Sequence, residues 1–588
     1  MEKVFKENHE HEQESLFSPV KDLPTPIKKK LDNHWSTHFY EYVFSQIDEE
    51  KFAVLYHDGY SRPNKPANEL VSLEIIKEML GLSDQELEHG YLFDFQIRNA
   101  LGKEMMGDNI CPKTFNNFRR RLLEYEEETG RDLLHEVFIE HRDYLQEEFD
   151  IDASTQRMDS TFIDGNIKQL SRIDLIAKVV HNFLTDLPDA ELEELPGGMA
   201  EFADEENLEL SYTLPPGEVK ATLETLAEHV AWLVDRFEDE EAYNDLESFA
   251  HLERVLDEQC YRIPELEGED DEIEEDDDDE DDDDSPGWEP VRKFTTRSDE
   301  SGEDELRPGV LEEEAVDENQ ERVELRDGEE IDSDSLQNPH DDEATFRRKH
   351  TGEHVGYVAN FAETCGGENP FQLLTAVRAD TNNTDDADLL DRDVEDLAEM
   401  GLTDLLNDGG YTHNEVEARC RKHGITQHFT VIKGTAPPEG TLSLAEFEWD
   451  GFELLACAAG HEPLDQSHSE KGRISFRMAK EHCEGCEYKE RCRVEEKQNW
   501  YSFGFWERKL VIAQRRARLE DPASQEFLNQ RAGAESMINE VCHKSGKRAK
   551  FTGTIKVKNA STAKAIGTNL KRVSRHLNEE AASSETAG

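Results

Sequence analysis

The alternation of apolar and polar positions predicts a helical beginning for this chain of 588 residues. Over residues 20–150 apolar side chains recur every three or four positions, a spacing that places Ile75 and Met79 on one face of a helix. Ser83, followed three positions later by Glu86, predicts a capping box at the start of the next helix. The first part of the chain is therefore expected to be an α-helical module.

A further helix should begin at Pro112, in the run CPKTFNNFRRRL, because proline is well suited to a first helical turn. This helix carries three consecutive cations, Arg119, Arg120 and Arg121. Two interpretations remain open for them: a solvated basic turn, or the DNA-contacting helix of a small helical module.

Short apolar runs separated by turn signals predict strands in the middle of the chain. One strand surrounds Asp159, and a strongly helical run, RIDLIAKVVHNFLTDL, follows it. Strands and helices then alternate, which favours an α/β core. The further predictions are strands over 355–363 and 371–379, an acidic helix over 384–401, a short strand in LTDLLNDGGY, a helix ending near Gly424, and a strand in ITQHFTVIKG.

Between these parts lies a long acidic insertion. Residues 219–256 read as an acidic helical stretch, and residues 265–284 hold seventeen acids in twenty positions. Such low hydrophobicity predicts disorder or a linker over 261–340.

The net charge of −71, from 136 acids and 65 bases, argues at first against a partner made of phosphate. The distribution of charge changes that view, because residues 541–577 contain no Asp or Glu and ten Lys or Arg. The net negative charge has two possible origins, which can both contribute: a protein surface adapted to high salt, or one long acidic tract that supplies much of the total. The basic island is the expected phosphate-binding region, with candidate contacts at Lys544, Lys547, Arg548, Lys550, Lys556 and Lys558.

No run approaches the roughly twenty apolar residues of a membrane helix, and the first residues lack the apolar core of a signal peptide. A cytoplasmic protein without membrane contact is expected. The nine cysteines fit a reduced compartment better than a disulfide framework. Buried thiols are expected at Cys111, Cys260, Cys365 and Cys420.

Three carboxylates stand out by position: Asp159 in the first strand, Asp408 before the turn through Gly409 and Gly410, and Glu535 in a later helix. A turn after a strand is where open α/β sheets tend to place ligand sites. Oxygen ligands suit Mg²⁺ or Mn²⁺, and two such ions can promote in-line displacement at phosphorus. Asp164 remains an alternative to Asp159.

A second candidate site comprises four cysteines, the last three of which follow a C-x2-C-x5-C spacing. Thiolates at such spacing can hold a structural Zn²⁺, and His461 or His482 are alternatives for one ligand. The four are Cys457, Cys483, Cys486 and Cys492.

Several of these stretches, in this order, resemble DDE transposases of prokaryotic insertion sequences, over nearly all of residues 30–577. The stretches are SRPNKPANELVSLEIIKEMLGLSDQELEHGYLFDFQIRNALG with CPKTFNNFRRRL, DSTFIDGNI with RIDLI, HDDEATFRRKHTGEHVGYVANFAET, LNDGGY, CEGCEYKERC, and RAGAESMINEV with KRAKFTGTIKVKNASTAKAIGTNLKRV.

The resemblance implies a ribonuclease H-like catalytic core with Asp159, Asp408 and Glu535 as the metal-binding triad. It also implies DNA strand cleavage and strand transfer. Arg531 and Lys544 are expected to be the first contacts near the scissile phosphate, because cations there offset charge that develops in the transition state. Related transposases often carry a Tyr, Arg, Glu, Lys pattern around the third acid, and here the Tyr and Lys positions are Leu528 and Cys542. A DNA hairpin step that relies on those residues is therefore not expected unless Lys544 substitutes.

On this basis the chain is expected to bind the inverted repeat ends of its element and a target DNA as a homo-oligomer. The expected parts are a helical DNA-binding module over 20–150, a mixed-sheet catalytic core over 151–184 and 345–434, an acidic insertion over 185–344, a Cys-rich insertion over 435–500, and a catalytic helix with a basic end over 501–577. The alternatives are a ribonuclease H-like nuclease that cuts without joining, and an inactive, domesticated DNA-binding protein.

Overall fold

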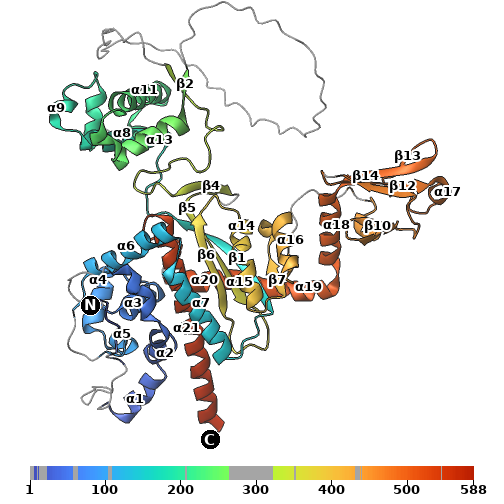
Figure 1. Cartoon of the computed structure of the whole chain (residues 1–588), viewed down its shortest axis with the longest axis horizontal. Helices are drawn as coiled ribbons and strands as arrows, with labels where there is room; N and C mark the ends of the chain where they lie inside the picture. Colours follow the sequence, from blue (N-terminus) through green and yellow to red (C-terminus); the bar gives the residue numbers. More distant parts are fainter. Residues whose placement is uncertain are drawn as a thin grey trace, which may run out of the picture. The chain divides into compact units, whose positions relative to one another are not determined.

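The computed structural model divides the chain into two compact units (Figure 1). The first comprises residues up to 170 together with those from 333 onward, and the second comprises residues 171–332. The acidic tract over 265–284 lies outside the described residues. The structure describes residues 5–9, 11, 23–56, 64–103, 109–205, 208–263, 322–349, 352–430, 438, 440–469, 471–544 and 546–587.

The N-terminal region of the first unit is helical, as predicted. The capping box is confirmed, because the Ser83 and Glu86 side chains each accept from the other residue's backbone N–H. The helices are α1 (Thr25–Asp32), α2 (Trp35–Tyr42), η2 (Phe44–Gln46), η3 (Glu49–Leu55), α3 (Ala67–Leu80), α4 (Asp84–Phe93), α5 (Phe95–Ala100), α6 (Pro112–Thr129) and α7 (Leu133–Glu148).

Helix α3 differs from the one-sided helix that its pattern predicted, because residues 67–79 are all buried. The C-terminal helix α21 (Thr554–Ala587) packs on it, and a Cβ on Gly567 would lie only 2.9 Å from the Met79 Cβ. The polar side chains on the covered faces of α3 are held by ion pairs, such as Lys77 with Asp84 at 2.7 Å.

A six-stranded mixed sheet forms the centre of this unit. The long strand β5 lies antiparallel to β1, and it pairs on its other side with β4 over its first residues and with β6 over its later ones. Beyond β1, strands β7 and β8 run parallel to it. The strands are β1 (Thr155–Asp164), β4 (Thr345–Lys349), β5 (Gly352–Thr364), β6 (Leu374–Thr381), β7 (Asp404–Asn407) and β8 (Thr426–Phe429).

Helices cover both faces of this sheet. Met158 of β1 packs with apolar side chains of α14 (Asp386–Asp391), α15 (Val394–Glu399) and α16 (Asn414–Lys422). Ile163 and Phe361 belong instead to the larger core shared with α7, α20 (Ala534–Cys542) and α21. An α/β fold with a helical N-terminal region is therefore confirmed.

The single helix predicted over 384–401 is wrong, because the chain forms the two short helices α14 and α15 there. Between them Asp393 turns inward, is only 1% exposed and accepts a hydrogen bond from Arg378 Nε at 2.6 Å. Interrupting the helix allows this carboxylate to meet its cation on β6, which an exposed helical position would not permit.

The second unit is mainly helical, and its core includes the rings of Phe183, Phe237 and Phe249. The continuous helix expected over 219–256 is interrupted twice, and β3 extends the described chain into part of the predicted linker. Its elements are α8 (Arg172–Asp186), α9 (Asp189–Leu192), η4 (Met199–Ala203), α10 (Leu210–Thr213), α11 (Val219–Phe237), α12 (Glu241–Asn244), α13 (Glu247–Gln259) and the paired strands β2 (Cys260–Ile263) and β3 (Arg322–Leu325).

The Cys-rich region has a small core of its own, in which Phe476, Tyr501 and Phe505 are buried. A four-stranded antiparallel sheet carries these side chains. The elements are η7 (Leu444–Glu446), β9 (Glu448–Asp450), β10 (Glu453–Ala456), β11 (Asp465–His468), β12 (Arg473–Ala479), α17 (Lys480–Cys483), β13 (Glu495–Glu496) and β14 (Trp500–Trp506).

The chain then continues through α18 (Glu507–Glu520), α19 (Pro522–Leu528) and the turn η8 (Asn529–Gly533) into α20, and η6 (Gly409–Tyr411) completes the short helices. All nine cysteines are free thiols, but Cys111 is exposed and not buried as expected. Across the described ranges no helix is long and apolar enough to cross a membrane.

Arg119 on α6 is buried, with 8% exposure, and its guanidinium holds α3 and α4 together. Nε donates to Glu74 at 3.0 Å, and two further nitrogens donate to the Asp84 carboxylate at 2.7 Å. The Phe551 ring centroid lies 4.7 Å from this guanidinium and 4.3 Å from the Lys77 ammonium. Arg119 is therefore a structural residue of the helical module.

Replacing Arg119 by Ala should destabilise the helical region by about 3–5 kcal/mol, because two carboxylates would lose their buried partner. Arg120→Ala on the same helix, an exposed position, should change the free energy of unfolding by less than about 0.5 kcal/mol. Denaturant titrations of both variants measure the difference. Equal midpoints would show that the network contributes nothing to stability.

Candidate active site

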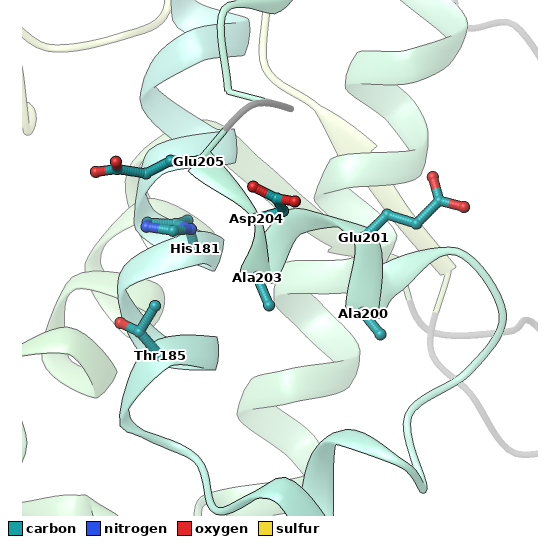
Figure 2. Close-up of a pocket in the computed structure, with 7 residues that line it drawn as sticks. All are labelled: His181, Thr185, Ala200, Glu201, Ala203, Asp204 and Glu205. Atoms are coloured by element: carbon teal, nitrogen blue, oxygen red, sulfur yellow. The ribbon is translucent and has the colours of Figure 1, made fainter.

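A hollow of about 850 Å³ on the second unit has small and acidic walls (Figure 2). His181 and Thr185 stand one turn apart on α8, and His181 Nδ1 lies 2.8 Å from the Phe202 carbonyl oxygen. The remaining lining residues are Ala200, Glu201, Ala203, Asp204 and Glu205. Carboxylates around an open hollow disfavour a phosphate ligand, so the candidate chemistry lies instead at the mixed sheet.

The parallel pairing of β1 with β7 brings two predicted acids together. Arg157 lies beside Leu406 in this ladder, and Asp159 and Asp408 follow two residues later along the two strands. Side chains two apart on a strand share a face, and neighbouring strands lie roughly 4.8 Å apart. Asp408 continues the strand direction with extended backbone, at φ −88° and ψ −178°. The two carboxylates therefore start from adjacent positions on one face.

Asp159 is a largely buried acid whose side chain is 17% exposed, and the charge of Arg531 compensates part of its negative charge. Its Oδ1 lies 3.0 Å from Arg531 Nη2 and accepts from the Ser160 N–H at 3.1 Å. Burial raises the pKa of Asp159 and the charges of Asp408 and Asp386 add to the rise, whereas Arg531 opposes it. The site thus concentrates negative charge that a single guanidinium only partly offsets.

Asp408 and Asp386 both flank Gly410. Asp408 Oδ1 accepts from the Gly410 N–H at 2.6 Å and fixes the tight turn. A Cβ at Gly410 would lie 2.6 Å from Asp386 Oδ2 and 2.8 Å from Asp408 Oδ1, so a side chain here would displace both carboxylates. Asp386 belongs to α14, and nothing in the sequence pattern separated it from the other 135 acids.

Tyr411 closes the inner side of this group of acids. Its hydroxyl donates to Asn360 Oδ1 on β5 at 2.5 Å. Burial raises the pKa of Tyr411 well above its ordinary value, and the charges of Asp386, Asp159 and Asp408 raise it further. Tyr411 therefore remains protonated and anchors the turn after β7, a role that the sequence did not indicate.

Glu535 lies in the first turn of α20, four residues after Arg531, and is exposed. Helix α20 packs against β1, which places its start near the strand that carries Asp159. No three His, Cys, Asp or Glu side chains within the described ranges are arranged to hold one metal ion. The structure thus brings Asp159 and Asp408 together with Asp386. The side chain of Glu535 is exposed to solvent and does not join this group of acids.

Asp164, the alternative to Asp159, lies five residues further along β1 and so faces the opposite side of the strand. Its Oδ1 is 3.2 Å from His354 Nδ1. Leu528 and Cys542, at the expected Tyr and Lys positions, are both buried and belong to apolar cores. Neither of them faces the group of acids as a polar residue.

Several lysines of the basic island form ion pairs within the protein. Lys550 Nζ lies 3.1 Å from Glu78, and Lys558 Nζ contacts Glu126 and lies 2.9 Å from Asp132. Lys556 is half-buried. These side chains fasten α21 and its preceding loop to the N-terminal helices.

The exposed cations are fewer than the sequence suggested. Lys544, Lys547 and Arg548 are exposed on the segment between α20 and α21. This segment adjoins the end of β1, where the Asp164 N–H donates to the Lys547 carbonyl at 2.8 Å. On α6, Arg120 is exposed, whereas the Arg121 guanidinium lies 4.8 Å from the Tyr56 ring centroid.

The four predicted zinc ligands line one enclosed cavity of about 30 Å³ in the Cys-rich region. Burial raises the pKa of Cys483 to about 11, and the neighbouring Cys492, Cys457 and Cys486 add to the rise. His461 and His482 line the same cavity, with ring centroids 4.2 Å apart. Three chain segments therefore line one cavity with thiols, although these thiols are not arranged around a single ion in the described part of the chain.

Comparison with known proteins supports the reading of the C-terminal part. Residues 456–574 match a family model described as a transposase DDE domain, which confirms the resemblance to DDE transposases. The matched segment contains the Cys-rich sheet, Arg531, Glu535 and most of α21, and it begins after Asp408. No curated protein and no solved structure matches the chain.

The matched domain implies phosphoryl transfer on DNA of the transposase type, and with it DNA binding and catalytic activity. DDE transposases generally use divalent metal ions. The matched segment thus favours transposition as the function class of the C-terminal part of the chain.

Replacing Gly410 by Ala should lower DNA cleavage by roughly 100-fold, because the new methyl group displaces the Asp408 and Asp386 carboxylates by about an ångström. Gly367→Ala is the matched control, since a Cβ there meets nothing within 4 Å. Cleavage of a labelled DNA substrate by both variants gives the comparison. Wild-type cleavage by Gly410→Ala would show that the turn does not fix the reacting groups.

Proposed function

We propose that this protein is the transposase of an insertion sequence, which binds the inverted repeat ends of its element, cleaves the DNA strands there and joins them to a target. The observation that carries the proposal is the adjacent placement of Asp159 and Asp408 on the parallel strands β1 and β7. A pair of carboxylates fixed by a sheet, close to a guanidinium, is suited to phosphoryl transfer.

The order of the strands supports a ribonuclease H-like core for this function. Counting only β1, β5, β6, β7 and β8, three antiparallel strands are followed by two strands parallel to the first. The insertion of the second unit between β1 and β4 leaves this order intact. The proposed catalytic core is thus assembled from β1 and residues 345–434, and 501–577 supplies its last helix and basic end. Residues 171–184, which the sequence placed in this core, belong to the second unit.

The donor atoms present fit divalent cations. Asp159, Asp408 and Asp386 contribute oxygen only, and Asp386 Oδ1 is buried without a hydrogen-bond partner among the described residues. Asp159 and Asp408, with Glu535 from α20, would hold two Mg²⁺ or Mn²⁺ ions. When bound, such ions activate a water or a 3′ hydroxyl and stabilise the leaving oxygen.

The chain's own residues orient the reaction around these acids. The Gly410 N–H donates a hydrogen bond that orients the Asp408 carboxylate. The Tyr411 hydroxyl donates to Asn360 and so holds the turn after β7 against β5. Arg531 pairs with Asp159, and its guanidinium would donate hydrogen bonds to an oxygen of a phosphate bound beside these acids. Arg531 would therefore offset charge that develops on the phosphate during strand cleavage.

The exposed cations provide the proposed path for the DNA backbone. Lys544, Lys547 and Arg548 lie next to the end of β1, and phosphate contacts there would lead a strand past the acids. The helical module over 20–150 would add contacts through Arg120. Binding of two element ends requires two copies of such a surface, so we propose a homo-oligomer in the active complex.

Asp408→Asn should reduce strand cleavage to below roughly one hundredth of wild type, because the loss of a ligand exceeds the 10–100-fold effect of outer groups. Binding of element ends should be unchanged. Asp450→Asn, an exposed position on β9, is the control and should cut normally. Retained cutting by Asp408→Asn would remove this residue from the catalytic group.

The same assay separates the three functions when it contains Mg²⁺, oligonucleotides matching the element ends and a target plasmid. Joined products identify a transposase, and cuts without joining identify a nuclease. Binding without either reaction identifies a domesticated DNA-binding protein.

We also propose that the Cys-rich region holds one structural Zn²⁺ through Cys457, Cys483, Cys486 and Cys492. The region has a core of only nine buried apolar side chains, and small cores of this kind need a cross-link. The four thiols come from the turn after β10, the end of α17 and the segment that follows it. One ion would tie these segments together.

Cys486→Ser should lower the melting temperature of the Cys-rich region by several degrees and remove bound zinc. Cys111 is exposed and distant in sequence from these four cysteines, so Cys111→Ser should retain one zinc per chain and the wild-type melting temperature. Elemental analysis and calorimetry test both. A purified wild-type protein without zinc, whose melting does not respond to added zinc, would contradict the site.

A further inference from the structure

Asp386 is a buried acid to which the function proposed above assigns no role as a metal ligand. It is the first residue of α14, directly after the turn that leaves β6, and it is 8% exposed. Carboxylates rarely reach this degree of burial unless they are paired. The burial of this carboxylate therefore requires an explanation, because an acid at the start of a helix is usually exposed to solvent.

The Asp386 carboxylate faces the carboxylate of Asp408. Because Oδ2 of Asp386 lies 2.6 Å and Oδ1 of Asp408 lies 2.8 Å from the same point, the ideal Cβ position of Gly410, these two oxygens are at most 5.4 Å apart. The charge of Asp386 is also felt by Asp159 and by Tyr411. Three acids from β1, α14 and the turn after β7 thus converge.

The remaining oxygen of Asp386 has no protein partner. Among the described residues, Oδ1 is buried and accepts no hydrogen bond. Nε of Arg531, the guanidinium that pairs with Asp159, is likewise buried without an acceptor in the described part of the chain. A buried carboxylate that faces a second one and lacks a donor is unfavourable unless a cation compensates it.

We infer that Asp386 is a further ligand of the divalent cation proposed for Asp159 and Asp408, an inference that rests on the function proposed above. Because no three acids of the described residues are yet arranged around one ion, binding requires these side chains to move closer together. Unlike Glu535, whose side chain is in solvent, Asp386 is already fixed by the packing of α14 against the sheet. Asp386 would thus let the protein bind a first cation before α20 and DNA complete the site with Glu535.

The test is Mn²⁺ binding to the full-length protein without DNA, followed by the electron paramagnetic resonance signal of free Mn²⁺. Concentrated KCl in the buffer screens nonspecific binding to a chain of net charge −71. Asp386→Asn should weaken the tightest site by at least roughly tenfold. Asp388→Asn, an exposed acid on the same helix, is the matched control and should bind as wild type.

Thermal melting provides the second readout and guards against misfolding. In EDTA, Asp386→Asn should melt at or above the wild-type temperature, because repulsion between two carboxylates is relieved. On addition of Mn²⁺, the wild type should gain stability and Asp386→Asn should gain less. Asp386→Glu, which keeps the charge, should recover part of the Mn²⁺ response.

The outcomes distinguish this inference from the function on which it rests. If Asp408→Asn loses the tight site and Asp386→Asn keeps it, Asp386 is not a ligand, and the proposed function stands. If neither substitution changes the tight site, both the inference and the proposed cation site fail. A stable Asp386→Asn protein with an unchanged Mn²⁺ response would equally overturn the inference.

Discussion

Three residue pairs of a parallel ladder, from Thr155 beside Asp404 to Arg157 beside Leu406, fix Asp159 relative to Asp408. A slip of one residue would turn Asp159 to the other face of the sheet. The register is held from the other side by β5, which pairs with β1 from Gln156 to Asp164. Every role given to Arg531, Gly410 and Tyr411 depends on this alignment, since each contacts or constrains one of the two acids.

The acid-rich chain uses many of its few cations internally. Arg119, Lys550 and Lys558 join the N-terminal helices to one another or to the C-terminal segment, and Arg572 of α21 binds Glu363 and Glu540. Partly buried pairs are screened less by salt than exposed ones. The architecture therefore keeps its internal ion pairs under conditions that weaken contacts with a phosphate backbone, and Lys544, Lys547 and Arg548 remain exposed as the proposed DNA contacts.

Local patterns were sufficient to predict much of the fold. The capping box at Ser83, the strand around Asp159 and the helix after Pro112 each depend on a few neighbouring residues, and all three are confirmed. Partners distant in sequence were not predictable in this way. The pattern could not show that Asp393 interrupts a helix to reach Arg378, or that α21 covers the outer face of α3.

The candidate site was predictable to the same extent. Asp159 and Asp408 stood out because each occupies a strand or its end, whereas Asp386 lies in an ordinary acidic helix. Its importance follows only from the approach of α14 to Gly410, a tertiary contact. Arg119 misled for the converse reason, because a run of three arginines hides which member points inward.

The contact of Gly567 on α21 with Met79 on α3 has a consequence for biosynthesis. Nearly five hundred residues separate them, so at roughly 5–20 residues per second the N-terminal helices wait on the order of a minute for their covering helix. Throughout that interval the apolar side chains of α3 that α21 covers remain exposed to solvent. Folding of the helical module is thus tied to the synthesis of α21, and translation that stops before α21 leaves the first helices without their covering helix.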